Sequence, residues 1–474
     1  MQSLPPPRLQ RRLFLVWILA LAVCLALFVW AFHKLDAEPP AKSGKTAEKK
    51  ASEPSGKSAV ASTASGKSWR APVPPFDPDK AEYLLTAFST QGMKHVTDAE
   101  PAWSMLRPGN ILVAQLIRRG PTPAVVSGKE NVRIRYTLDA PYADNGNSPV
   151  AQGELKPQDD GLAFASAPIA VMPYTVDGGF APYPTARVEA LAPDGRLLAE
   201  TRVVLPVSTE IGCRNCHTGP WKKDGKAGIS KQTAGNILEA HDRRSNTHLK
   251  EQADKGETVD CLSCHGSTPE APNLSAAVHG FHATMKLKGA EACASCHPSS
   301  ETGSTRFFRD FHSLWGLDCT RCHGRLEDHA LSLLKAEAEK GNAAAAERMS
   351  QILPAAEAKD IAPRAPWVNL PDCKGCHNFT ARPDSSNATA AGKWTKNSGE
   401  LYANSLDNTG NLRCPSCHGA PHAVYPASGP DGDDRDNIQP MQYQKMAAPL
   451  GKDGNCAVCH TIPMDYFIHH DRVE

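Results

Sequence analysis

The alternation of apolar and polar residues divides the chain into stretches of different character, beginning with an uncharged run from Leu13 to Phe32. A helix of about twenty residues is about 30 Å long, the thickness of the hydrocarbon core of a bilayer. Arg8, Arg11 and Arg12 precede the run, and basic residues beside a membrane span stay on the cytoplasmic side. Residues 1–37 are therefore predicted to be a cytoplasmic stub and an uncleaved transmembrane anchor, with the inner membrane as a partner and the bulk of the chain in the periplasm. A cleaved signal peptide is the alternative, but no clear small-x-small cleavage site is present.

The next stretch, residues 38–75, is rich in Lys, Ala, Ser, Pro, Glu and Gly and has few large apolar residues. Such a composition cannot bury enough apolar surface to fold, so a flexible linker is predicted. Residues 76–208 differ, because several short segments alternate apolar with polar residues as half-buried strands do. The clearest segments are 110–117, 131–138 and the two that flank the Pro193-Asp-Gly turn. They predict a small antiparallel β-sandwich of immunoglobulin-like type, whose role is docking, spacing or oligomer contact.

Residues 209–474 show little regular periodicity, apart from the Ala-, Glu- and Lys-rich segment Leu326–Leu353. Apolar residues recur there at helical spacing, which predicts one surface helix, or two with a break at Gly341-Asn342. Short helices and irregular loops are expected elsewhere. The predicted fold class is therefore multidomain: a transmembrane helix, a β-sandwich and a mostly α and irregular domain.

The charge of the chain narrows the choice of partners. Its 52 Lys and Arg residues are matched by 51 Asp and Glu residues, so the net charge is close to zero. A chain without a basic excess has no field that attracts nucleic acid, and no nucleic-acid partner is predicted. The oligomeric state stays open.

The pattern Cys-x-x-Cys-His occurs seven times between residues 213 and 460 and uses 14 of the 15 cysteines. Two thiols at positions i and i+3 lie on one side of a helical turn, where they can bond the two vinyl groups of a haem while the adjacent His points at the iron. Zinc ribbons also pair Cys-x-x-Cys units, but they do not require a His after each pair. Each copy is therefore interpreted as a c-type haem attachment site. The cysteines are Cys213, Cys216, Cys261, Cys264, Cys293, Cys296, Cys319, Cys322, Cys373, Cys376, Cys414, Cys417, Cys456 and Cys459.

This set of motifs resembles the multihaem c-type cytochromes. The resemblance implies seven covalently bound haem c groups and a heptahaem domain over residues 209–474. It also implies that the motif histidines are the proximal ligands of the irons. These are His217, His265, His297, His323, His377, His418 and His460.

Three segments of the C-terminal part are similar to a recurring pattern in proteobacterial and metal-reducer periplasmic electron-transfer cytochromes. They are Arg364-Ala-Pro-Trp, Leu401-Tyr-Ala-Asn-Ser and Cys417-His-Gly-Ala-Pro-His422. The similarity implies an electron-carrier role and favours His422 as an iron ligand.

The ligand on the second face of each iron decides the function, because an iron with two protein ligands has no position left for a substrate. Seven histidines outside the motifs lie between the first and last motif, which is the number that seven bis-His irons require. They are predicted to be the distal metal ligands: His241, His248, His279, His282, His312, His329 and His422. A methionine is the alternative at one iron, from among Met285, Met441, Met446 and Met464.

One distal ligand is expected from another part of the chain. The relatives tend to place a His between Ser405 and Cys414, and this sequence has none there. His469, His470 and His95 are the candidates. His95 falls in the predicted sandwich, and an exposed loop position is the favoured interpretation for it.

The favoured function is electron transfer through the seven haems, without substrate chemistry. Electrons would pass from inner-membrane donors, such as a quinol-oxidising complex or other cytochromes, to periplasmic, outer-membrane or extracellular acceptors. The alternative is a multihaem reductase of nitrite, hydroxylamine or a sulfur oxyanion with one open iron. Relatives of that kind often replace a motif His by Lys, whereas all seven copies here end in His. A haem filament is a third, less favoured hypothesis.

Overall fold

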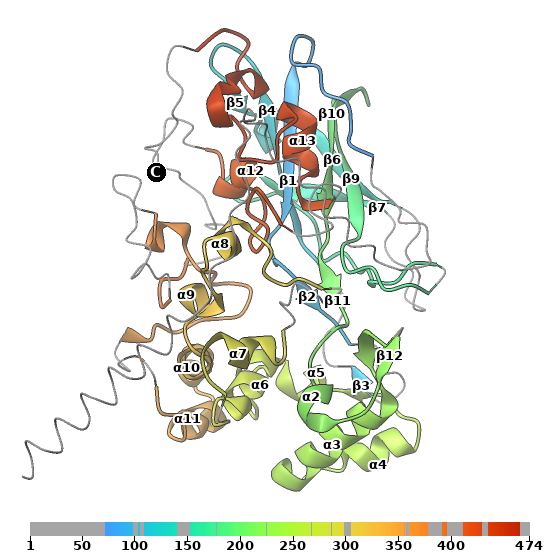
Figure 1. Cartoon of the computed structure of the whole chain (residues 1–474), viewed down its shortest axis with the longest axis vertical. Helices are drawn as coiled ribbons and strands as arrows, with labels where there is room; N and C mark the ends of the chain where they lie inside the picture. Colours follow the sequence, from blue (N-terminus) through green and yellow to red (C-terminus); the bar gives the residue numbers. More distant parts are fainter. Residues whose placement is uncertain are drawn as a thin grey trace, which may run out of the picture. The chain divides into compact units, whose positions relative to one another are not determined.

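Two units make up the chain in the computed structural model, residues 1–65 and residues 66–474, and every described residue belongs to the second. Figure 1 labels the strands and helices of that second unit. The structure describes residues 72–97, 103–104, 109–139, 152–176, 178–223, 225–266, 268–285, 287–297, 305–354, 356, 360–377, 391–395, 411–428 and 435–464. The predicted four-part division of the chain stays a prediction.

The largest element is one eight-stranded antiparallel sheet. Its strand order is β1-β4-β8-β7-β6-β9-β10, with β5 paired to β4. The two strands at the ends of this order, β1 and β10, pack against each other, so the sheet nearly closes on itself. The strands are β1 (Tyr83–Ser89), β4 (Leu112–Arg118), β5 (Ala124–Val125), β6 (Arg133–Leu138), β7 (Gln152–Pro157), β8 (Phe164–Ala165), β9 (Thr185–Leu191) and β10 (Leu197–Val204).

The seam between β1 and β10 is covered by helix α13 (Ile438–Gln444), which lies beside both strands in Figure 1. The Gln439 side chain accepts a hydrogen bond from the Ala87 amide of β1 at 3.0 Å. On the other strand, Gln442 accepts from the Thr201 hydroxyl and donates to the Glu200 carbonyl, both at 2.8 Å. Side-chain amides of α13 thus satisfy strand-edge groups that would otherwise attract another chain.

Burial along the strands explains why only part of the sheet is visible in the hydrophobic pattern. In β6, Ile134 and Tyr136 are buried while their neighbours face solvent, which is the alternation of a half-buried strand. In β1 and β4, nearly every residue is buried. The second face of these strands is covered by α13 and by the helix α12 (Cys414–His418). A strand buried on both faces shows no alternation.

Three two-stranded pairs lie outside the main sheet. β2 (Lys94–His95) pairs in parallel with β11 (Val207–Ser208), and β3 (Trp103–Ser104) pairs in parallel with β14 (Val259–Asp260). β12 (Trp221–Lys223) and β13 (Ala227–Ile229) form an antiparallel pair. The first two pairs connect the sheet-bearing part of the chain with segments that follow it.

The part of the chain after residue 208 contains many helices, and most are short. Their starts carry ordinary caps: the side chains of Ser230, Asn273 and Asn342 accept hydrogen bonds from amides in the first turns of α3, α6 and α11. The helices are α2 (Arg214–His217), α3 (Lys231–Ser245), α4 (Leu249–Asp254), α5 (Leu262–His265), α6 (Leu274–His282), α7 (Gly289–Ala294), α8 (Phe311–Leu314), α9 (Cys319–His323), α10 (Leu326–Ala338) and α11 (Ala343–Met349). Single 3-10 turns cover Gly128–Glu130, Cys373–Gly375, Lys452–Gly454 and Cys456–Val458.

The segment predicted as one helix or two proves to be two, α10 and α11, separated where the sequence indicated. Gly341 has a φ of 91°, a left-handed conformation that ends a helix, and Asn342 caps the next. Leu333 and Leu334 of α10 are buried against α6 and α11. Packing against these two helices therefore holds the segment in place.

The predicted transmembrane anchor is wrong as a description of this structure. No helix in the described part of the chain is long and apolar enough to cross a membrane. The run Leu13–Phe32 itself lies outside the described residues. The membrane partner, the anchored periplasmic location and the membrane keywords rested on that helix alone, so none of them is carried further.

The predicted fold class is also corrected in its two other parts. The β-rich segment forms one nearly closed sheet, because β1 and β10 pack together, and not a two-sheet immunoglobulin-like sandwich. The region of the motifs is not mostly α. Within its described residues only α3 and α10 exceed nine residues, and the β12–β13 pair and long loops separate the other helices.

Candidate cofactor-binding sites

Each described Cys-x-x-Cys-His motif folds into one tight turn. The amide of the motif His donates a hydrogen bond to the carbonyl of the first Cys, at 2.9 Å from His217 to Cys213 and 2.8 Å from His297 to Cys293. The same bond closes the turns at residues 261–265, 373–377 and 456–460. This turn brings both thiols and the imidazole to one short stretch of backbone, as haem attachment requires.

The motif cysteines are half-buried, apart from Cys216 and Cys264, which are exposed. None of the 14 forms a disulfide among the described residues. Burial raises the pKa of Cys213, Cys322 and Cys459 to about 12, whereas a hydrogen bond with Cys293 lowers the pKa of Cys319 to about 7. A thiol with a raised pKa is protonated at neutral pH and is a poor nucleophile.

Zinc binding is the other use of paired cysteines. A structural zinc site needs four Cys or His ligands around one point. Within the described residues, no group of three or more His, Cys, Asp or Glu side chains gathers in a way that would hold a metal ion. The geometry therefore does not favour the zinc interpretation.

The histidines are oriented as metal ligands are. In six of them the Nδ1 atom is hydrogen-bonded locally, which fixes the ring and leaves Nε2 for a metal. Four bonds go to backbone carbonyls: His265 to Pro272 at 2.8 Å, His279 to Ser275 at 2.8 Å, His282 to Val278 at 2.7 Å and His460 to Pro121 at 3.1 Å. The other two are His241 to the Thr247 hydroxyl and His312 to Asp310, both at 3.0 Å.

Motif histidines also lie opposite histidines from other segments. A metal–imidazole bond is about 2.0 Å long, so two imidazoles on opposite sides of one metal have ring centroids roughly 6 Å apart. Several pairs have this separation. They are His241–His265 at 6.3 Å, His279–His297 at 6.2 Å, His312–His377 at 6.1 Å, His323–His422 at 6.0 Å and His323–His329 at 5.8 Å.

For the first motif, the pairing is indicated by electrostatics. Burial lowers the pKa of His217, and the nearby His282 lowers it further. His282 comes from the end of α6, three residues after His279. One turn of α6 therefore presents imidazoles to two motifs, the first and the third.

Six histidines lie close together in what we call the central histidine cluster, where His95 is buried and the other five are half-buried. Burial lowers the pKa of His297 to about 3 and those of His279 and His422 to about 4. The neutral imidazole that results is the form that binds a metal. The members are His95, His279, His297, His323, His329 and His422.

Several nitrogens in the central histidine cluster have no hydrogen-bond partner among the described residues. They are Nδ1 of His297, Nδ1 of His422 and both ring nitrogens of His95. Leaving a buried polar atom unsatisfied costs about 1–3 kcal/mol each, so such atoms point to a missing ligand. The residues therefore fit a bound metal-containing group.

Arg364 adds a buried charge to the same place. Its guanidinium lies 3.3 Å from Nδ1 of both His323 and His329, and only 7% of the residue is exposed. Burial lowers its pKa to about 10. No ion pair in the described part of the chain neutralises it, although an unpaired buried charge is costly. A haem carries carboxylates that would balance this charge.

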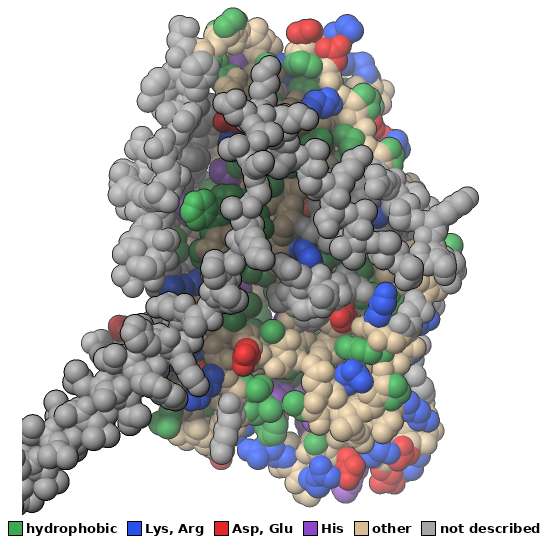
Figure 2. Space-filling view, viewed as in Figure 1, with side chains coloured by type: hydrophobic (Ala, Val, Ile, Leu, Met, Phe, Trp, Pro, Cys, Tyr) green, Lys and Arg blue, Asp and Glu red, His purple; other side chains and the backbone are tan. Residues whose placement is uncertain are grey.

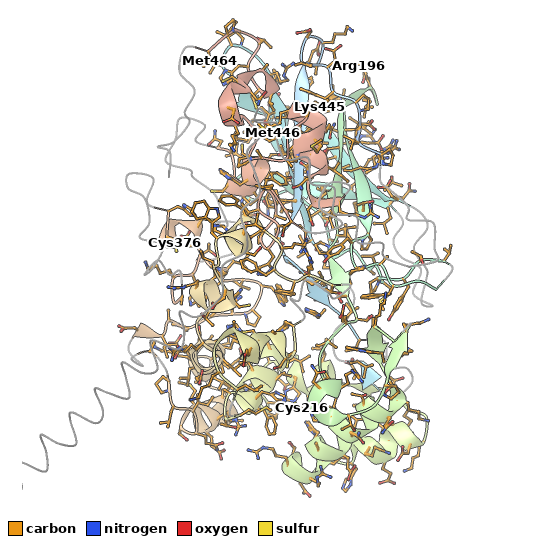
Figure 3. All side chains as sticks on the ribbon, viewed as in Figure 1. Arg196, Cys216, Cys376, Lys445, Met446 and Met464 are labelled. Atoms are coloured by element: carbon orange, nitrogen blue, oxygen red, sulfur yellow. The ribbon has the colours of Figure 1, made fainter. Side chains whose placement is uncertain are left out.

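Neighbouring motifs touch one another. The Gly212 amide donates to the Cys296 carbonyl at 2.9 Å, which joins the first motif to the third. The thiol of Cys293 is hydrogen-bonded to that of Cys319, joining the third to the fourth. The motifs are still spread through the fold: Cys216 of the first and Cys376 of the fifth are widely separated in Figure 3.

Further thiol contacts extend this series. Cys373 of the fifth motif is hydrogen-bonded to Cys414 of the sixth. The pKa of Cys322 is raised by burial and then by the neighbouring Cys376, which places the fourth motif beside the fifth. The order of contact is therefore first, third, fourth, fifth and sixth.

The main sheet holds the last two motifs, a role that the sequence did not reveal. Gln115 of β4 accepts hydrogen bonds from the Arg413 amide at 2.9 Å and the Ser416 hydroxyl at 2.7 Å. Arg119, just after β4, donates to the carbonyls of Val458 at 3.0 Å and Ala457 at 2.7 Å. The sequence signal for the contact with the sixth motif is the polar residue Gln115 within the predicted strand 110–117.

Four predicted positions turn out differently or lie outside the described residues. His248 is exposed at the start of α4, and within the described residues no ring of another histidine is placed against it. His469 and His470 lie outside the described residues. His95 was expected in an exposed loop, and this interpretation is wrong because the residue is only 5% exposed. A second histidine opposite His418 and another opposite His460 stay predictions. Any role of the four methionines also stays a prediction.

The face drawn in Figure 2 shows Lys and Arg side chains intermixed with Asp and Glu. This mixture agrees with the near-zero net charge of the sequence.

Comparison with known proteins gives little further guidance. No protein-family model matches the chain, and no curated protein matches it. Among solved structures, the chain is similar to the crystal structure of MtrC from Shewanella baltica OS185, at 16% identity, over 46% of this chain and 36% of that one, with a TM-score of 0.13. A score this low carries no argument about fold or function. The Cys-x-x-Cys-His turns are compatible with covalent haem c on their own geometry.

Proposed function

We propose that the chain is a multihaem electron-transfer protein with a haem c at each of its seven motifs. The observation that carries this proposal is the set of imidazole pairs about 6 Å apart, each joining a motif His to a His from another segment. Such pairs fit metals bound by protein on both faces. When bound, the haem irons supply a reversible one-electron redox couple.

The residues of the chain divide the work of holding these groups. The thiols of each motif form the covalent links, and the motif His binds the iron on one side. Ring distances support His241, His279 and His312 as second ligands for the second, third and fifth motifs. For the first motif, His282 is proposed because it lies close enough to lower the pKa of His217. For the fourth motif, His422 and His329 both lie at a suitable distance from His323.

Two protein ligands on an iron exclude substrate from it, so these residues favour electron transfer over catalysis. The local Nδ1 bonds of His279 and His312 hold each ring in place, so the ligand does not leave readily. The low pKa values of the central histidine cluster keep its imidazoles unprotonated. The chain is therefore proposed to be a carrier and not an enzyme, with other redox proteins as its partners.

The order of contact between motifs supports a path for electrons. Thiol contacts join Cys293 to Cys319 and Cys373 to Cys414. Groups attached to touching motifs lie close together, and close spacing makes electron exchange between them efficient. The proposed path runs through the first, third, fourth, fifth and sixth motifs.

The test combines a count of haems with a measurement of their ligation. Intact mass and a pyridine haemochrome assay of the purified chain should give seven covalent haems, one per motif. Low-temperature EPR of the oxidised protein should show low-spin iron only, and the reduced protein should not bind CO. A chain without covalent haem would contradict the proposal. A high-spin iron that binds CO would favour a reductase instead.

A matched variant sharpens the test. His312 is the histidine that faces His377, at 6.1 Å. The variant His312→Ala should keep its full haem content and convert about one-seventh of the iron to a high-spin, CO-binding form. The exposed His248→Ala should leave the spectrum unchanged.

A further inference from the structure

The third motif has two histidines beside His297, whereas one iron takes only one second ligand. The ring of His279 lies 6.2 Å from that of His297, with the ring planes 15° apart. The ring of His95 lies 4.8 Å from that of His297, tilted by 57°. At the fifth motif, by contrast, His312 is the ring placed opposite His377.

His95 is held beside His297 although its polar atoms gain nothing there. The residue is 5% exposed, and neither ring nitrogen has a hydrogen-bond partner. Burial without hydrogen bonds is unfavourable for an imidazole, which could instead face water. Such a ring is retained where it has a ligand to bind. A neutral imidazole with an unused lone pair is a ready metal ligand.

The two candidate ligands come from independent parts of the fold. His279 lies on α6, and its Nδ1 is bonded to the Ser275 carbonyl at 2.8 Å. His95 lies on β2, which is joined to β11 of the β-rich part of the chain. The ring of Phe307 stacks on His95 at 5.2 Å and also contacts His297 at 5.3 Å. Loss of His279 therefore leaves His95 beside His297, with its ring at 4.8 Å, nearer than the 6.2 Å of the His279 ring.

We propose that His95 and His279 are alternative sixth ligands of the iron attached at the Cys293–His297 motif, which rests on the proposed haem function. His279 has the spacing of a bound pair, and His95 is the reserve ligand. With a metal bound there, Nε2 of His95 would hold it when His279 does not, and no electron or proton would be transferred. The two residues together keep this iron closed to substrates.

The experiment compares three variants of the haem-loaded chain: His279→Ala, His95→Leu and the double variant. Each single variant should stay low-spin by EPR and should not bind CO. The double variant should convert about one-seventh of the iron to a high-spin form that binds CO. Added imidazole should return that fraction to low spin, which shows that the protein around the site is still folded. His312→Ala, which removes the histidine that faces His377 at 6.1 Å, is the positive control.

Three results would overturn the inference. High-spin iron in His279→Ala alone would show that His95 does not bind. High-spin iron in His95→Leu alone would show that His95 is the required ligand and not a reserve. A double variant that stays low-spin would show that neither residue is the ligand. If the unaltered chain lacks covalent haem, the proposed function is wrong and this inference is wrong with it. If the haem content is full and any of these three results is found, only this inference is wrong.

Discussion

The sheet and the motif region of this chain are stabilised in opposite ways. The sheet surrounds one large apolar core that includes Leu112, Leu116, Ile134 and Phe164, all at most 1% exposed. The motif region has two smaller apolar clusters, one around α3 and α4 and one around α6, α10 and α11. Beside these clusters lie histidines of which several have buried nitrogens without a hydrogen-bond partner among the described residues. The sheet therefore has an apolar core of its own, while the proposed haems would complete the core of the motif region.

The largest effect should come from withholding haem. The chain produced without haem attachment should keep slow amide hydrogen exchange in β4 and β6, because the core that they line consists of protein side chains. Amides of α9 and α12, the turns of the fourth and sixth motifs, should exchange much faster than in the loaded chain. Hydrogen exchange with mass spectrometry measures both regions in one experiment. Equal protection of the motif helices with and without haem would contradict the comparison.

The next largest effect should follow from breaking the buried ion pair of the motif region. Arg309 and Asp436 have side chains 2% and 6% exposed and are joined at 2.6 Å. Removing one partner leaves a buried charge unpaired, so Asp436→Ala should lower the free energy of unfolding by about 3–5 kcal/mol. Chemical denaturation of the loaded chain measures this loss. The exposed pair Arg243–Glu239 provides a control, because Glu239→Ala should change stability far less.

A cavity in the sheet core should have a comparable or smaller effect. Leu116 is fully buried, and Leu116→Ala should lower the free energy of unfolding by about 2–5 kcal/mol. The loss should appear in the chain without haem as well, because the sheet core does not depend on the ligand. Leu197 is 47% exposed, and Leu197→Ala should change stability by about 0.5 kcal/mol or less. A Leu116→Ala effect seen only in the loaded chain would contradict an independent sheet core.

The smallest effect should come from the contact between the two regions. Gln115→Leu removes the acceptor for Arg413 and Ser416 and should cost about 1–3 kcal/mol. The variant should be cleaved by protease faster than the unaltered chain mainly around Cys414, in the sixth motif. Limited proteolysis with mass spectrometry locates the cleavage. Cleavage spread equally over all motifs would show that Gln115 has no specific link to the sixth.

The sequence predicted most reliably what depends on neighbouring residues. The alternation in 131–138 corresponds to strand β6, and the break at Gly341-Asn342 separates α10 from α11. The motif turns follow from their own residues. In contrast, the nearly closed sheet was missed because β1 is buried on both faces and shows no alternation, and because β1 packs against β10, which lies far from it in the sequence.

Features that depend on residues far apart in the sequence could not be predicted from the hydrophobic pattern. The strand β2, which carries His95, has two residues, too few to show a period. The ring of His95 contacts that of His297, which lies far away in the sequence. The pairing of His241 with His265 follows only from tertiary packing. The count of seven histidines was informative. It did not show that His279, His329 and His422, together with His95, gather around the third and fourth motifs.

The central claim is that the seven motifs hold haems whose irons are bound by protein on both faces. Quantitative low-temperature EPR of the oxidised chain, normalised to its pyridine haemochrome content, tests it most directly. The account predicts seven haems per chain, all low-spin, with none converted by CO after reduction. A chain without covalent haem, or one with most of its iron high-spin, would contradict it.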